Sequence, residues 1–133
     1  MPKATLTLCP CESGQVYVRC CEPYHLGATV PTAVALMRSR YVAYYLGLEV
    51  YLLKTWHPDT RPLKLDLFEI ENVRWIGLQV KSTQMLDDRT ATVAFVARYK
   101  VAGKAERLVE NSLFKRDGES WFYWAAVEAE NLL

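Results

Sequence analysis

The protein has 133 residues, of which 51% are hydrophobic and 23% charged, and 16 Lys+Arg against 15 Asp+Glu give a net charge of +1. Nucleic-acid-binding proteins usually carry a basic excess, and disordered chains combine high charge with few large apolar residues. The composition therefore indicates a globular protein without a nucleic-acid partner. No apolar run approaches the roughly 18 residues of a membrane span, and the N-terminus is too polar for a signal peptide. We expect a cytoplasmic protein with no membrane partner.

The cysteines are confined to one short segment and occupy positions Cys9, Cys11, Cys20 and Cys21. A disulfide framework spreads its cysteines along the chain and belongs to oxidising compartments. Two close pairs of cysteines can instead place four thiolates around one tetrahedral Zn²⁺, and Ser13-Gly14 supply a turn between them. The segment therefore predicts a structural zinc site, with free thiols or disulfides as the alternative.

His25 leaves one question open inside this site. It follows Cys21 by four residues, and its imidazole could replace one thiolate as a zinc ligand. Histidines at such positions are more often simply packed or exposed to solvent. We therefore predict four cysteine ligands and keep His25 as the alternative.

The cysteine segment reads Cys-Pro-Cys-x-Ser-Gly-x-x-Tyr-x-x-Cys-Cys between Cys9 and Cys21, and it resembles the SEC-C zinc motif. That motif occurs at the C-terminus of the SecA translocase motor, where it recognises other macromolecules, and on many unrelated bacterial proteins. The resemblance implies Zn²⁺ as cofactor and a protein partner that binds through this cysteine segment, which we call the finger. Glu12 departs from the motif, which usually has glycine there, and we expect it to place a carboxylate beside an anionic site and to loosen the turn.

The next part of the chain predicts helices. Apolar residues between 32 and 46 follow the 3, 4, 7 spacing of one helical face, with Pro31-Thr32 as the start and Gly47 as the end. A second, short helix is expected over 49–55, ended by the turn before Pro58. Residues 65–71 are expected to form one more short helix.

The last part of the chain predicts strands. Residues 90–99 alternate between apolar and polar with the period of a half-buried strand, and similar runs cover 73–84, 108–115 and 120–127. Turn residues at 87–88, 103–104 and 116–119 favour antiparallel hairpins. Helices followed by strands indicate an α+β domain in which a curved antiparallel sheet of about four strands wraps the long helix.

Three further segments, 23–25, 32–44 and 55–62, resemble the YchJ-like family of bacterial proteins. This resemblance implies a cone-shaped, cystatin-like domain of the nuclear-transport-factor-two-like kind, with a pocket between sheet and helices. We therefore expect a zinc-binding segment over residues 1–27 and the α+β domain over residues 28–133. We also expect chelation to melt the finger first and leave the cone folded.

Candidate pocket residues lie on the long helix and in the turn after the second helix, namely Arg38, Tyr41, His57 and Arg61. Arg38 and its neighbour Arg40 could hold an anion, although helix arginines are more often exposed or ion-paired. His57 and Asp59 could form an oriented base, but both also suit a helix end and a turn. Because no catalytic constellation is identified, we favour a zinc-binding protein-interaction module over an enzyme. The alternative is a small-molecule or enzymatic pocket around His57.

Four consecutive aromatic residues, 121–124, lie on the last predicted strand. Alternation sends Trp121 and Tyr123 to one face of the sheet and Phe122 and Trp124 to the other. One pair should fill the cone. The other pair should meet the finger, the C-terminus or a second chain, so we expect a homodimer through the open face as one outcome.

Overall fold

The computed structural model describes residues 7–65 and 73–132, with side chains up to residue 127. Its helical part consists of the short 3₁₀ helix η2 (Tyr17–Arg19), α1 (Glu22–His25), α2 (Ala33–Leu46) and α3 (Glu49–Lys54). Strands β1 (Val73–Asp87), β2 (Thr90–Val101), β3 (Lys104–Asp117) and β4 (Ser120–Leu132) follow. The α+β prediction is confirmed. The short helix expected over 65–71 falls, except for Leu65 itself, outside the residues that the structure describes.

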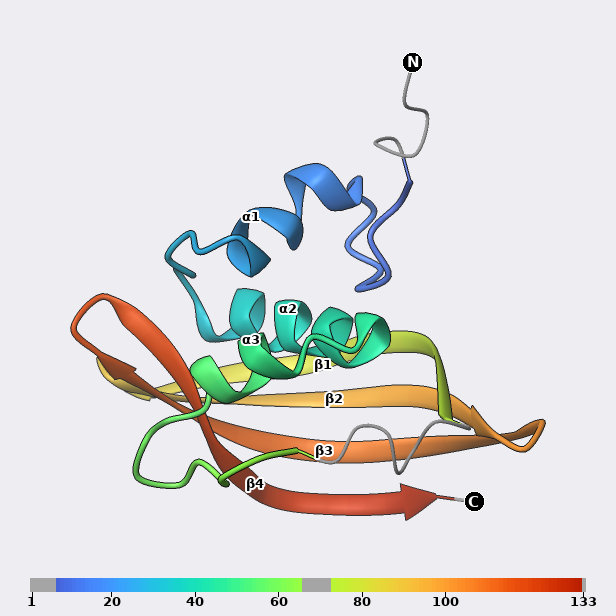
Figure 1. Ribbon diagram of the computed structural model, residues 1–133. Helices are drawn as coiled ribbons and strands as arrows, with labels where there is room; N and C mark the ends of the chain where they lie inside the picture. The colour runs from blue at the N-terminus through green and yellow to red at the C-terminus, as the bar shows by residue number, and fades with distance from the viewer. Residues whose placement is uncertain (1–6, 66–72, 133) are drawn as a thin grey trace.

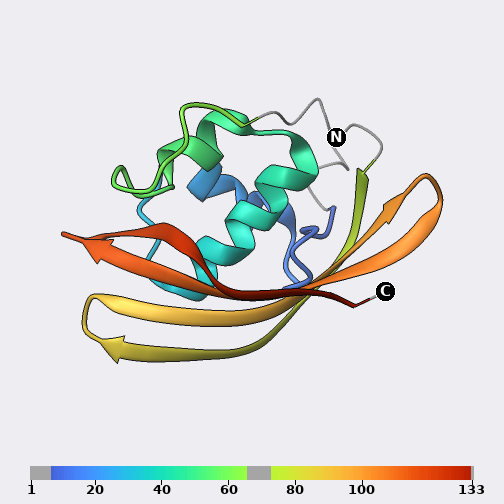
Figure 2. The same cartoon turned by 90° about the horizontal axis from the view of Figure 1, so that it is seen from below.

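The sheet is a simple antiparallel meander in the order β1-β2-β3-β4, and a two-residue turn joins each strand to the next. Register shifts interrupt β1 at three places and the β3–β4 pair at two. Such bulges bend strands and increase their twist. Figures 1 and 2 show the result, a curved sheet that wraps around α2.

Helix α2 begins and ends at the residues that the sequence indicates. Thr32 is the N-cap, and its Oγ1 accepts a hydrogen bond from the Ala35 backbone N–H at 3.0 Å. Gly47 follows the helix in the left-handed conformation, with φ 77°, which glycine adopts without a steric penalty. Among the described helices of the structure, none is long and apolar enough to cross a membrane.

The aromatic residues of β4 alternate as expected. Trp121 is buried in the core, and Tyr123 packs against the same core. On the other face, the His57 ring contacts the rings of Phe122 and Trp124, with centroids 5.7 and 4.9 Å apart. Backbone hydrogen bonds of 2.8 Å from His57 N to Tyr123 O and from Tyr123 N to Thr55 O hold this turn against β4. The turn after α3 therefore covers the outer aromatic pair.

One apolar core runs through the finger and the cone. Cys9, Cys11 and Cys21 are buried in the same cluster as Leu36 of α2 and Val93 of β2. Figure 1 shows the finger on one side of α2 and the sheet on the other. Helix α2 is therefore the middle of three layers, and the finger forms the outer layer.

Candidate metal centre and cavity

The four cysteine sulfurs converge at one point of the finger. All four Sγ atoms lie within 4.8 Å of one another, and Cys11 Sγ is 3.6 Å from Cys20 Sγ, which is 4.0 Å from Cys21 Sγ. Four sulfurs placed 2.3 Å from one Zn²⁺ in a tetrahedron are about 3.8 Å apart. The donor set and its spacing therefore fit a metal ion with four thiolate ligands.

Local backbone structure brings the two cysteine pairs together. Leu8 and Val16 form an antiparallel bridge, and Cys9 N donates to Gln15 O at 2.8 Å. Gly14, with φ 91°, makes the turn between them, as the sequence predicts. The chain then returns through η2 and α1, which place Cys20 and Cys21 opposite the first pair. The hydroxyl of Ser13 lies 3.1 Å from Cys20 Sγ and can donate a hydrogen bond to a thiolate there.

Without a metal, the cluster cannot carry four negative charges, because buried like charges disfavour each other. Hydrogen bonds from Cys21 and Cys9 lower the pKa of Cys11. The shared hydrogen bond with Cys11 raises the pKa of Cys9 to about 12 and also raises the pKa of Cys21. Part of the cluster therefore keeps its protons when no cation is bound. A bound cation would have to displace the remaining protons, so its binding is expected to weaken at low pH.

His25 is engaged elsewhere and joins the finger to α2. Its Nε2 lies 2.9 Å from Ser39 O, and its Nδ1 lies 2.7 Å from the Tyr17 hydroxyl. A carbonyl oxygen only accepts, so Nε2 carries the proton and Nδ1 accepts from Tyr17. Burial lowers the pKa of His25, which favours this neutral form. Both ring nitrogens therefore have partners outside the cysteine cluster, and His25 does not belong to the group of converging sulfurs.

Two other side chains fix the finger on the cone. Arg38 Nη1 donates to Cys11 O at 2.6 Å, so this arginine binds the finger and does not face a cavity. Glu12 Oε2 accepts from the Leu78 backbone N–H of β1 at 2.8 Å. Glu12 therefore makes a defined contact with the sheet, which the expected loosened turn and carboxylate beside an anionic site did not include.

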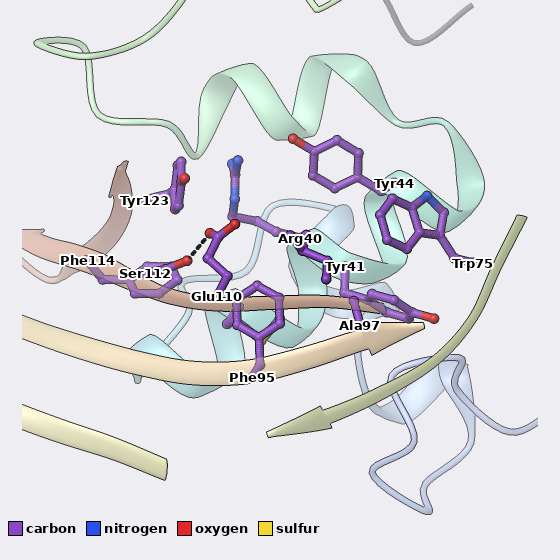
Figure 3. A pocket seen from close by; sticks show the side chains of 12 residues that line it. Arg40, Tyr41, Tyr44, Trp75, Phe95, Ala97, Glu110, Ser112, Phe114 and Tyr123 are labelled. Atoms are coloured by element: carbon purple, nitrogen blue, oxygen red, sulfur yellow. Dashed lines mark hydrogen bonds between the residues drawn. The ribbon is translucent and has the colours of Figure 1, made fainter. Parts of the chain in front are cut away.

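A cavity of about 280 Å³ lies between α2 and the inner face of the sheet. Figure 3 shows its walls, which are aromatic and aliphatic except for a few polar groups. The lining consists of Met37, Arg40, Tyr41, Tyr44, Trp75, Phe95, Ala97, Leu108, Glu110, Ser112, Phe114 and Tyr123. Arg40 enters from the helix, while Glu110 and Ser112 come from β3, where Ser112 Oγ donates to Glu110 Oε2.

The structure distributes the predicted pocket residues over three places. Tyr41 lines the cavity, and burial raises its pKa. Arg38 contacts the finger, His57 packs on β4, and the exposed Arg61 donates from Nε to Trp56 O at 3.0 Å. Of the expected set, only Tyr41 lines the cavity between α2 and the sheet, and the His57 turn instead pairs with β4.

Arg40 and Glu110 are the charged residues of the cavity; the sequence offers both as polar candidates, but the expected pocket set of Arg38, Tyr41, His57 and Arg61 includes neither. A signal for Arg40 is present in the helical spacing. It lies three and four residues after Met37 and Leu36 and four before Tyr44, on the face that meets the sheet. Arg38 lies on a different face. Strand alternation places Glu110 on one face of β3 with Leu108, Ser112 and Phe114, but the other face carries Val109 and Leu113, so the pattern does not indicate which face is the inner one.

The sequence matches two protein-family models. Residues 32–126 match the model described as "YchJ, middle NTF2-like domain", and residues 7–23 match the SEC-C motif. The second match ends just after the last cysteine, and the first begins at the N-cap of α2. The two matches therefore cover the cone and the finger separately.

Similar proteins span nearly the whole chain. A UPF0225 protein of Chromobacterium violaceum is 50% identical, over 96% of this chain and 97% of its own. A SEC-C motif containing protein from Rhodopseudomonas palustris, solved in solution, aligns with a TM-score of 0.79 and 30% identity, over 94% of this chain and 98% of that one. The crystal structure of a SEC-C motif containing protein from Psychrobacter arcticus gives a TM-score of 0.78 and 29% identity, over 97% and 86%. The chain therefore belongs to the YchJ-like UPF0225 family, which joins a SEC-C motif to an NTF2-like domain.

Proposed function

We propose that the protein is a zinc-binding protein in which Zn²⁺ is a structural ion that fastens the finger to the cone. The main support for this proposal is that the four Sγ atoms lie within 4.8 Å of one another and that three of the four cysteines are buried. Four thiolates fill a tetrahedral shell and leave no open position for a substrate. The ion would supply charge neutralisation and cross-linking of the finger, and nothing in this arrangement uses it for catalysis.

The surroundings of the cluster support a structural role. The Cys11 carbonyl accepts from Arg38 of α2, and Glu12 accepts from Leu78 of β1. Cys11, one of the proposed ligands, and Glu12 beside it therefore make contacts that hold the finger on the cone. A metal that orders residues 9–21 orders these contacts as well.

Metal analysis of the purified protein tests the proposal. We expect one zinc per chain, and we expect Cys11→Ser and Cys21→Ser to lower the zinc content well below one. His25→Gln is the matched control, because His25 uses both ring nitrogens outside the cluster, and it should retain one zinc. Iron in place of zinc, or loss of zinc in the histidine variant, would contradict the assignment.

A second proposal concerns the outer face of the finger, which we infer is a docking surface for a protein partner. Leu8 and Leu26 are 63% and 80% exposed, and Ser13, Gln15 and Arg19 of the same segment are also exposed. Exposed leucines on a cross-linked segment offer apolar contact at little entropic cost, which favours binding. The resemblance of the segment to fingers that recognise macromolecules supports the same interpretation.

Site-specific photo-crosslinking in living cells tests this surface. A crosslinker at Gln15 should give one dominant product, while the same group at Glu119, in the exposed β3–β4 turn, should not. The Leu8→Ser and Leu26→Ser variants should weaken the product. A second copy of the chain as that product would redirect the proposal to a homodimer, and equal products at both positions would refute a specific surface.

A further inference from the structure

The cavity between α2 and the sheet contains a buried cation. Arg40 is 5% exposed, and its Nη1 donates to Leu52 O and Thr55 Oγ1, both at 2.7 Å. No carboxylate within residues 7–65 or 73–127 forms an ion pair with it. The nearest opposite charge that acts on it is the Glu110 carboxylate, which lines the same cavity but forms no direct ion pair. A buried charge without a direct partner is costly, so it is found where the protein uses it.

The neighbours of Arg40 hold its guanidinium in place without neutralising it. Its Cζ lies 4.6 Å from the centre of the Tyr123 ring and 5.3 Å from that of Trp56. Both hydrogen bonds to the end of α3 use Nη1, and the Tyr44 hydroxyl also interacts with the guanidinium, so its five N–H donors are only partly used among the described residues. The indole Nε1 of Trp56 is also buried without a hydrogen-bond partner in this part of the chain. Donors therefore outnumber acceptors around Arg40.

The opposite wall offers an acceptor. Glu110 rises from β3 toward the cavity, as Figure 3 shows, and Ser112 Oγ donates to its Oε2. Its charge is felt across the cavity, because it contributes to raising the pKa of Tyr123 and of Tyr44. One wall thus presents cationic donors, the other presents a carboxylate, and aromatic rings lie between them.

This arrangement defines the chemistry of a ligand. An anionic group would satisfy the free donors of Arg40, for which a planar carboxylate is the matching partner. A hydroxyl or amino group would satisfy Glu110, and an apolar body would contact Trp75 and Phe95. The volume of about 280 Å³ is slightly below the roughly 300–1,000 Å³ of ligand pockets, so the ligand is small.

We propose that the cavity is a binding site for a small hydroxy or amino acid with an apolar body, whose carboxylate binds Arg40 and whose donor binds Glu110. The site is independent of the metal centre, since no cysteine lines it. Arg40 supplies most of the affinity. Glu110 discriminates among carboxylates by requiring a donor.

Calorimetric titration with three matched probes tests the site. 3-Phenyllactate carries carboxylate and donor, 3-phenylpropionate carries only the carboxylate, and 3-phenyl-1-propanol has no carboxylate. We expect affinity to fall in that order. Loss of a charge-assisted hydrogen bond should weaken binding by about tenfold or more. Absence of binding for all three, or equal binding of the alcohol and the acids, would overturn the proposal.

Variants of the protein complete the test. Arg40→Met should weaken both acids by about tenfold or more without changing the weak binding of the alcohol. Because Arg40 also anchors α3, Ala97→Leu is a second variant, which fills the cavity and should abolish binding of every probe. Glu110→Gln should reduce the preference for phenyllactate over phenylpropionate. Arg98→Met, on the exposed side of β2, is the matched control and should bind as the unaltered protein does. Undiminished binding in folded Ala97→Leu would overturn the assignment.

Discussion

Glu12 shows how a single residue couples two parts of the molecule. Its φ of 63° lies in the left-handed region, where a side chain costs about 1 kcal/mol relative to glycine. Its Oε2 accepts from the N–H of Leu78, which the β1–β2 pairing leaves at the edge of the sheet. Glutamate in place of the glycine of the SEC-C motif therefore strains the backbone at residue 12 but adds a hydrogen bond to the cone.

Substitution of Glu12 separates these two effects. We expect Glu12→Ala to lower the free energy of unfolding by about 1–2 kcal/mol, because the strain stays and the Leu78 N–H loses its acceptor. Glu12→Gln keeps an acceptor and should cost less. Glu12→Gly should fall between them because it loses the acceptor but relieves the strain. Urea denaturation measures all three, and equal stability of Glu12→Ala and the unaltered protein would show that the contact contributes nothing.

Gly77 provides an independent test of the same contact. A Cβ at this position would lie 2.9 Å from Glu12 Oε2, so the carboxylate would have to move away from Leu78. We expect Gly77→Ala to destabilise the unaltered protein by about 1 kcal/mol but to be neutral or favourable in the Glu12→Ala background. A double-mutant cycle from urea denaturation measures this coupling. Strictly additive effects would exclude it.

Among the secondary-structure elements, α2 is the one that contacts both the sheet and the finger. One face meets the sheet, and the Ser39 carbonyl and the Arg38 side chain bind the finger on the other. The ends of this helix are defined by Thr32 and Gly47. The stability of both the finger contacts and the cavity therefore depends on how well α2 is formed.

The N-cap of α2 can be tested directly. Thr32→Ala removes the oxygen that accepts from Ala35 N, and we expect a loss of about 1 kcal/mol in the free energy of unfolding. Thr32→Ser keeps the oxygen and is the matched control. Thermal unfolding followed by circular dichroism measures both. An equal loss in the serine variant would show that the Thr32 methyl group, and not the cap, is responsible.

The sequence predicted the elements because their signals are local. Capping at Thr32, left-handed glycine at Gly47 and alternation along β2 each act within a few residues. The clustered cysteines predicted a metal site for the same reason. The pocket was harder, because the choice between Arg38 and Arg40 depends on which face of α2 meets a sheet formed more than 30 residues later. The docking of Glu12 on Leu78 had no signal, since 66 residues separate the partners.

At the scale of the whole molecule, the finger and the cone share their core. Cys9, Cys11 and Cys21 pack in one buried cluster with residues of α2 and the sheet. This observation changes the expectation that the cone survives loss of the metal unaltered. A cluster that spans both parts favours cooperative unfolding.

We expect chelation of the metal to lower the unfolding midpoint of the entire protein in a single transition. Structural zinc contributes about 10–16 kcal/mol of apparent binding free energy in small peptides, and the shared core transmits part of such a loss to the cone. Tryptophan fluorescence reports on Trp75 and Trp121 near the sheet, and circular dichroism reports on the backbone. Coincident transitions support one unit. Early loss of the finger, with an unchanged midpoint of the cone, would contradict this prediction.

The separation between Glu12 and Leu78 also bears on the order in which the chain folds. The four cysteines lie within a short loop, which closes at little entropic cost, whereas the contact with β1 closes a loop of 66 residues. At about 5–20 residues per second, a ribosome needs about 3–13 s to add those residues. On the proposed zinc site, a nascent finger would bind its ion and shield its thiols from oxidation before the strand on which it docks has been synthesised.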